Sequence, residues 1–93
     1  MPATYTCIKI QKPAPAKLEK LNVASWPLWE KGPSIFDWHY DQTETCYLLE
    51  GRAKVQTDCE IVHFAAGDLV TFPRGLTCTW TITEPVKKHY RFG

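Results

Sequence analysis

A carboxylate and an ammonium group lie on inward-facing positions of two predicted strands. Glu44 shares a strand face with Cys46, and Lys88 shares a face of the last strand with Tyr90, because side chains alternate between the two faces of a strand. An ionised carboxylate on an apolar inner face is costly unless it is paired, so we expect Glu44 to pair with Lys88. These two residues are the candidate catalytic pair, as acid and base or as an ion pair inside a barrel. The alternative is an exposed pair at the barrel rim.

Aromatic and thiol side chains on the same faces would line a pocket around this pair. The candidate ligand-binding residues are Trp38, Tyr40, Cys46, Cys78, Trp80 and Tyr90. The aromatic rings could stack on a ligand, and they could equally fill the interior of a small barrel. The two cysteines are predicted to be small buried apolar residues rather than nucleophiles. A ligand pocket and a filled barrel therefore both stay open.

The segment from Gly32 to Gly51 resembles the first sequence motif of the cupin superfamily. That motif reads Gly, five residues, His-x-His, three or four residues, Glu, six residues, Gly. Both glycines and Glu44 fit with three residues before the glutamate, while Trp38 and Tyr40 stand at the two histidine positions. This register places Tyr40 in the pocket.

The spacing before Glu44 also allows a second register of the first motif. With four residues before the glutamate, Asp37 and His39 fall at the histidine positions, but the leading glycine no longer fits. In the preferred register His39 points outward and has a surface role. The choice decides whether Tyr40 or His39 faces the pocket.

A later segment resembles the second cupin motif, which reads Gly, five residues, Pro-x-Gly, two residues, His, three residues, Asn. Gly67, Pro73 and Gly75 fit, while Cys78 and Ile82 replace the histidine and the asparagine. With both motifs in order, the chain is similar to small single-domain cupins related to the ureidoglycine aminohydrolase group. The resemblance implies an all-β fold: a small antiparallel β-barrel or jelly roll, RmlC-like, that dimerises.

The resemblance also implies a divalent metal in the barrel mouth, held by three histidines and a glutamate. Only Glu44 of that set is present in the preferred register. Cys78 could ligate as a thiolate, with Cys46 beside it, and His39 would join them in the second register. Metal sites usually need three or four protein ligands, so we predict no metal and no cofactor. The missing histidines also argue against the metal-dependent aminohydrolase activity.

Short strands separated by turns are predicted for most of the chain. The predicted strands cover residues 4–10, 35–40, 43–49, 52–57, 61–64, 69–72, 76–83 and 86–92, and a short helix covers residues 14–21. A turn is expected at Glu84-Pro85, and Gly51 separates the predicted strands 43–49 and 52–57. We expect Leu18 of the helix to pack on the outside of a sheet, since so short a helix is unstable alone. Trp26 and Trp29 are expected in the core or at a subunit interface.

Composition and length limit the possible classes of protein. A chain of 93 residues makes a single domain, 1–93, with a marginal core and exposed sheet edges, so we expect a homodimer. A net charge of +1 gives no electrostatic case for nucleic acid or an anionic membrane. The absence of a long apolar run and of a signal-peptide pattern favours the cytoplasm. The four cysteines form no Cys-x-x-Cys pair and are predicted to be reduced.

Three functions agree with these observations. The first is a metal-free cupin that binds a small molecule in an aromatic pocket containing Glu44. The second is an enzyme acting on nitrogen-rich small metabolites, like ureidoglycine aminohydrolase, through acid–base chemistry of Glu44 and Lys88 or with a metal. The third is a structural or partner-binding module with a filled barrel. A cavity beside Glu44 would favour the first two.

Overall fold

The structure is a computed structural model that describes residues 8–93. Its elements are β1 (Lys9–Gln11), α1 (Pro15–Leu21), the 3-10 helix η1 (Val23–Ser25), β2 (Leu28–Lys31), β3 (Ser34–His39), β4 (Glu44–Gln56), β5 (Ile61–Ala65), β6 (Leu69–Phe72) and β7 (Thr77–Phe92). All strand pairings in this part of the chain are antiparallel. The predicted all-β fold with a short N-terminal helix is confirmed. Residues 4–7 of the first predicted strand lie outside the described residues.

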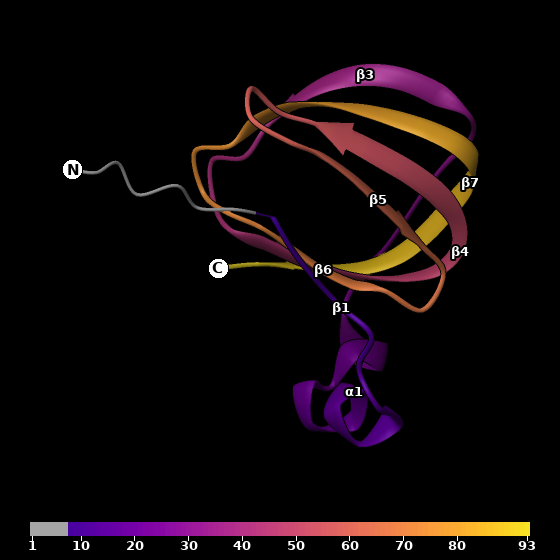
Figure 1. Cartoon of the computed structure of the whole chain (residues 1–93). Helices are drawn as coiled ribbons and strands as arrows, with labels where there is room; N and C mark the ends of the chain where they lie inside the picture. The colour runs from indigo at the N-terminus through magenta and orange to yellow at the C-terminus, as the bar shows by residue number, and fades with distance from the viewer. Residues whose placement is uncertain (1–7) are drawn as a thin grey trace.

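Two long strands, β4 and β7, build both layers of the barrel. The start of β4 pairs with β6 and with the end of β7, in the layer ordered β1-β6-β4-β7-β2. The end of β4 pairs with β5 and with the start of β7, whose other neighbour is β3. Figure 1 shows both strands curving from one layer into the other. The side chains between the layers form the core.

The predicted turn at Glu84-Pro85 and the predicted separation of two strands at Gly51 are wrong, because β7 and β4 continue through these points. The β4–β7 register shifts around Gly51, which has φ 100°, and such bulges bend a strand sharply. A Cβ atom on Gly51 would lie 2.2 Å from the Pro85 carbonyl oxygen, so the two backbones cross closely. Pro85 has no N–H to donate. Because it pairs with neither β2 nor β3, no hydrogen bond of those two ladders is lost.

The segment before β3 contains a strand that the sequence pattern did not predict. Residues Leu28–Lys31 form β2, which pairs with the end of β7. Trp26 is buried just before it, and Trp29 on β2 is half-buried. Trp26 is buried, with 8% exposed, whereas Trp29 borders a cavity described below.

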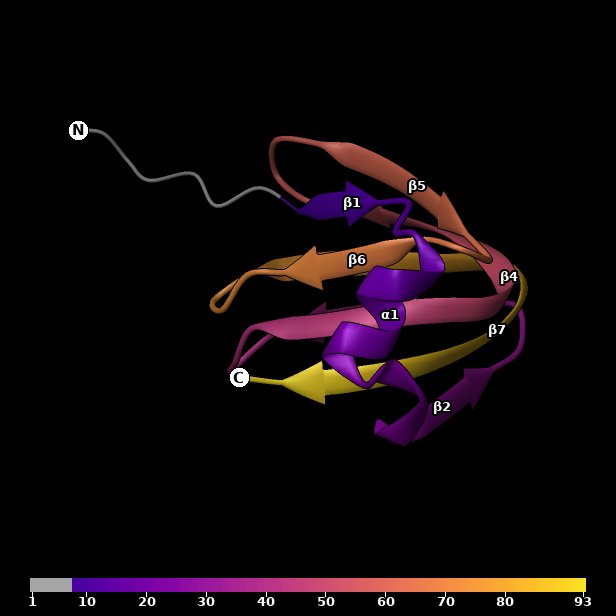
Figure 2. The ribbon, with the colours of Figure 1, turned by 90° about the horizontal axis from the view of Figure 1, so that it is seen from below.

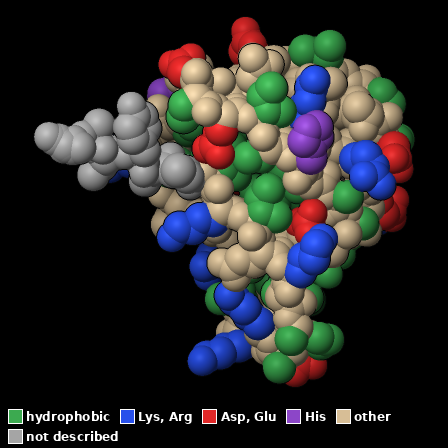
Figure 3. Space-filling model, in the orientation of Figure 1, with side chains coloured by type: hydrophobic (Ala, Val, Ile, Leu, Met, Phe, Trp, Pro, Cys, Tyr) green, Lys and Arg blue, Asp and Glu red, His purple; other side chains and the backbone are tan. Residues whose placement is uncertain are grey.

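The predicted helix is present as α1 and lies across the outer face of one layer (Figure 2). It ends at Leu21, and the next residue, Asn22, has a left-handed backbone (φ 57°) and donates its N–H to carbonyls of the last turn. Leu18 is only half-buried, since a groove of about 340 Å³ separates it from Tyr47 and Leu49 on β4. Lys and Arg side chains gather around α1, while the barrel face mixes both charges (Figure 3). Over residues 8–93, no helix has the length and apolarity to cross a lipid bilayer.

Candidate functional site

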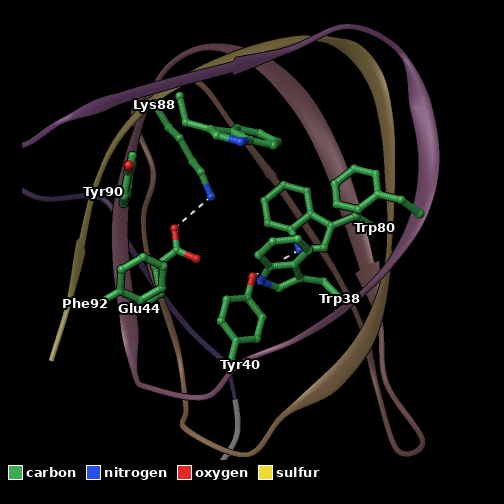
Figure 4. Close-up of a pocket in the computed structure, with 9 residues that line it drawn as sticks. Trp38, Tyr40, Glu44, Trp80, Lys88, Tyr90 and Phe92 are labelled. Carbon is green, nitrogen blue, oxygen red and sulfur yellow. Dashed lines mark hydrogen bonds and ion pairs between the residues drawn. The ribbon is translucent and has the colours of Figure 1, made fainter.

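A cavity of about 250 Å³ lies inside the barrel and contains the Glu44–Lys88 pair (Figure 4). The residues that line it are Trp29, Phe36, Trp38, Tyr40, Glu44, Trp80, Lys88, Tyr90 and Phe92. Trp38 and Phe92 stand at its mouth, since their side chains are 48% and 46% exposed. The cavity is therefore an aromatic chamber with one ion pair and an opening to solvent.

Glu44 and Lys88 form a buried ion pair at one wall of the cavity. Lys88 Nζ donates a hydrogen bond of 2.8 Å to Glu44 Oε2, and about 5% of each side chain is exposed. The Nζ atom also lies 4.8 Å from the ring centroids of both Trp29 and Trp80. Aromatic faces attract an ammonium group, most strongly where water is excluded. One carboxylate and two indole rings therefore fix the position of Lys88.

The β4–β7 ladder explains how two distant residues meet in this pair. Glu44 begins β4 and lies opposite Phe92, whereas Lys88 lies opposite Leu48. Both side chains point inward, and the long lysine side chain extends along the strands to reach the carboxylate. The sequence-based prediction of an internal pair thus agrees with the geometry, and the rim alternative does not.

Tyr40 supplies a phenol whose hydroxyl points into the cavity (Figure 4). Trp80 Nε1 donates a hydrogen bond of 3.1 Å to its hydroxyl, and its ring stacks on Phe72 at 4.9 Å. Burial, and then the nearby Glu44 carboxylate, raise the pKa of Tyr40 far above its ordinary value. The phenol is therefore neutral and keeps its proton at any physiological pH.

Contacts between aromatic rings hold the cavity walls in place. The Trp80 ring lies nearly parallel to Phe36, with centroids 5.9 Å apart, and meets Trp29 edge-on at 6.2 Å. Trp38 meets Phe36 edge-on at 6.5 Å near the mouth. Such pairs add stability beyond the area that they bury. Flat, rigid surfaces thus face the empty space.

The two inward-facing cysteines lie in the core and do not line the cavity. Cys46 and Cys78 are 0% and 4% exposed, and both are free thiols. Burial raises the pKa of Cys46 to about 12 and that of Cys78 to about 11. Neutral thiols are poor nucleophiles and poor metal ligands. Their interpretation as small buried residues agrees with this placement, and their assignment to the ligand-binding set does not.

The structure supports the first register of the glutamate motif. Tyr40 is 1% exposed and faces the cavity. His39 is exposed, with Nδ1 2.8 Å from the Thr77 hydroxyl. Asp37, the other residue of the second register, accepts a hydrogen bond from the Thr79 hydroxyl on the same outer surface. Neither Asp37 nor His39 can reach the cavity.

The residues at the four cupin ligand positions do not fit a metal ion. An indole such as Trp38 offers no lone pair, and the Tyr40 phenol is neutral and already accepts an indole N–H. Cys78 is held as a neutral thiol, and Glu44 is bound to Lys88. No group of three His, Cys, Asp or Glu side chains within residues 8–93 is placed to hold a metal. The Lys88 ammonium supplies the positive charge beside Glu44.

Three cavity residues were not among the predicted site residues. Trp29 was assigned to packing because β2 was not recognised, so the inward face of that strand could not be identified. Phe36 shares a strand face with Trp38 and Tyr40, and Phe92 shares one with Lys88. Alternation along these two strands was the signal that would have added Phe36 and Phe92 to the set.

The motifs and the barrel agree with the comparison to known families. Residues 18–90 match the Cupin_3 family, described as EutQ-like cupin domain. The chain belongs to this cupin family. The predicted cupin superfamily is thereby confirmed, and the aminohydrolase-like activity stays a prediction.

Several solved structures are similar to the structure of this cupin. A DUF861 family protein from Thermotoga maritima is 53% identical with a TM-score of 0.91, and the match covers 92% of this cupin and 99% of that chain. The Clostridium difficile EutQ protein is 22% identical with a TM-score of 0.65, and the match covers 70% of this cupin and 52% of that chain. A putative ethanolamine utilization protein Q from Salmonella typhimurium is 19% identical with a TM-score of 0.65, over 94% of this cupin and 69% of that chain. The last two share the fold. No curated protein matches the sequence significantly.

Proposed function

We propose that this cupin binds a small molecule in its barrel cavity and does so without a metal ion. The observation that supports this function is a cavity of about 250 Å³ whose aromatic walls surround one buried ion pair. A mostly apolar pocket with a few convergent polar groups is the usual form of a small-molecule site. A filled barrel would have no empty space beside Glu44. The cavity therefore favours ligand binding over a purely structural role.

Catalysis in the same cavity is the second candidate function. Glu44 and Lys88 both line the cavity and could exchange protons with a substrate. Binding is better supported, because each of the two groups is engaged by the other at 2.8 Å. A Glu44→Gln variant that keeps ligand affinity but loses turnover would favour the enzyme.

The four tryptophans allow a direct test of binding in the cavity. Trp29, Trp38 and Trp80 line the cavity, whereas Trp26 packs elsewhere, under the guanidinium of Arg91. We expect small aromatic fragments to shift the indole N–H signals of the three cavity tryptophans in ¹⁵N-edited NMR spectra. The Trp26 signal is the internal control and should not move. Fragments that shift only Trp26, or a library in which nothing shifts the other three, would contradict the proposed function.

We further propose that this cupin acts as a homodimer in the cytoplasm. Large apolar side chains on strands β2 and β3 support the dimer, since Leu28 is 50% and Ile35 is 72% exposed. The free thiols Cys46, Cys59 and Cys78 support a reducing compartment. The molar mass in solution tests the dimer.

A further inference from the structure

Glu44 and Tyr40 both have unused hydrogen-bonding capacity in the aromatic cavity. Glu44 binds Lys88 through one carboxylate oxygen, and Figure 4 shows the other oxygen pointing into the cavity. The Tyr40 hydroxyl makes one hydrogen bond within residues 8–93, as acceptor of the Trp80 N–H. Its own hydrogen stays available, and the phenol is neutral. Glu44 thus offers the cavity an acceptor and Tyr40 offers it a donor, while the Lys88 ammonium donates to Glu44 and lies over the Trp29 and Trp80 rings.

The charges of the cavity select against ionic ligands. Glu44 and Lys88 carry opposite charges and cancel each other. An anion placed beside the free carboxylate oxygen meets a like charge, and a cation meets the Lys88 ammonium. Either ion would also lose its hydration in an aromatic chamber, which is costly without a full counter-charge. A neutral ligand avoids both penalties.

The shape of the cavity selects flat ligands of modest size. The indole rings of Trp29, Trp38 and Trp80 and the ring of Phe36 present planar surfaces around about 250 Å³ of space. Aromatic or other planar groups pack on such surfaces in stacked or edge-on arrangements. A single ring with one small polar substituent suits this volume.

We propose that the cavity takes a flat, neutral ligand with an N–H donor and a carbonyl acceptor side by side, as in a primary carboxamide or a lactam. The N–H would donate to the free oxygen of Glu44, and the carbonyl would accept the Tyr40 hydrogen. The apolar part would lie against the indole rings. This inference rests on the proposed binding function and adds the ligand class to it.

Four probes that share one ring test the ligand class on the native protein. They are benzamide, benzoate, benzylamine as its cation, and toluene, titrated at pH 7 while the Trp80 indole N–H signal is followed. Benzamide should bind at least about fivefold more tightly than each of the others, since it alone satisfies both groups. Equal or tighter binding of benzoate, benzylamine or toluene overturns the ligand class but leaves small-molecule binding intact. Failure of benzamide to bind also overturns the proposed ligand class. The proposed binding function is then tested separately with the wider fragment library.

A phenol variant isolates the predicted hydrogen bond to the carbonyl. Tyr40→Phe removes the donor and should weaken benzamide about fivefold, with toluene unchanged. The matched control is Tyr47→Phe, which removes a phenol on the outer face of β4, beside the α1 groove and away from the cavity. Full benzamide affinity in Tyr40→Phe, or an equal loss in Tyr47→Phe, overturns the role of Tyr40.

Charge variants test why neutral ligands are preferred. Glu44→Gln leaves Lys88 without its carboxylate and should turn the preference toward benzoate. Lys88→Met leaves Glu44 unpaired and should turn it toward the benzylamine cation. A folded variant that still prefers benzamide over both ions contradicts the charge argument. Because either change can prevent folding, the native probe series and Tyr40→Phe decide the proposal without them.

Discussion

Replacing Lys88 by methionine separates the buried charge pair from the rest of the core. Methionine is similar in length and also unbranched, but it removes the ammonium that lies over the Trp29 and Trp80 rings. Glu44 then has no counter-charge and only about 5% of its side chain reaches solvent. Breaking a buried pair in this way costs about 3–5 kcal/mol. Because the cavity can admit water to the carboxylate, we expect the lower end, about 3 kcal/mol.

A double variant distinguishes the loss of a counter-charge from the loss of packing. In Lys88→Met/Glu44→Gln no buried charge is left, so its free energy of unfolding should return to within about 1 kcal/mol of native. The difference between the single and double variants then measures the coupling of the two residues. If the double variant is as unstable as Lys88→Met, poor packing of methionine explains the loss.

Urea unfolding followed by far-ultraviolet circular dichroism is the appropriate assay. Tryptophan fluorescence would respond directly to the missing ammonium, whereas the dichroism of the sheet reports unfolding alone. The matched control is Lys87→Met, because Lys87 neighbours Lys88 on β7, points to the other face and forms no ion pair within the described chain. Lys87→Met should stay within about 0.5 kcal/mol of native. Equal stabilities of Lys88→Met and Lys87→Met would refute the reasoning.

Three further predictions follow from the backbone crossing, the thiols and the exposed apolar strands. Gly51→Ala should lower the free energy of urea unfolding by about 3 kcal/mol, because its Cβ would meet a carbonyl at 2.2 Å. Gly67→Ala, with positive φ but nothing within 4 Å, should cost about 1 kcal/mol, and equal losses would contradict the close-crossing argument. The pKa of Cys46 is raised to about 12 and that of Cys78 to about 11, so the unfolded chain loses these protons first, near pH 9. The free energy of unfolding should therefore be highest below about pH 8 and should decline from pH 9 toward 12. In Cys46→Ala the decline should be less steep. Identical declines in the native protein and in Cys46→Ala would argue against buried neutral thiols. Light scattering should give twice the chain mass of 10.7 kDa, and a monomer at micromolar concentration would rule out the homodimer.

The alternation of residue types predicted the inward faces of the strands well. It placed Glu44 and Lys88 together inside the barrel and put Trp38, Tyr40, Trp80 and Tyr90 around them, as the cavity shows. It could not distinguish a side chain that borders the cavity from one in the core, because both point inward. That is why the two buried cysteines were grouped with the cavity residues.

Long-range pairing explains the elements that local patterns missed. A glycine and a proline usually end strands, yet Gly51 and Pro85 lie opposite each other where β4 and β7 bend together. Only the partner strand reveals that each is a bend within one strand. The strand β2 is short and follows Pro27, so its pairing with β7 rather than its own sequence makes it a strand. Trp29 was therefore not recognised as a cavity residue.

Metal content per chain is the most direct test of a metal-free ligand site in which the Lys88 ammonium lies beside Glu44. The protein should be purified without a chelator or a metal-affinity column, incubated with manganese, iron, zinc and copper salts, desalted, and submitted to elemental analysis. We expect far less than one ion per chain, with no difference between the native protein and Glu44→Gln. A nearly stoichiometric metal that is lost in Glu44→Gln and in Cys78→Ser would contradict the metal-free site.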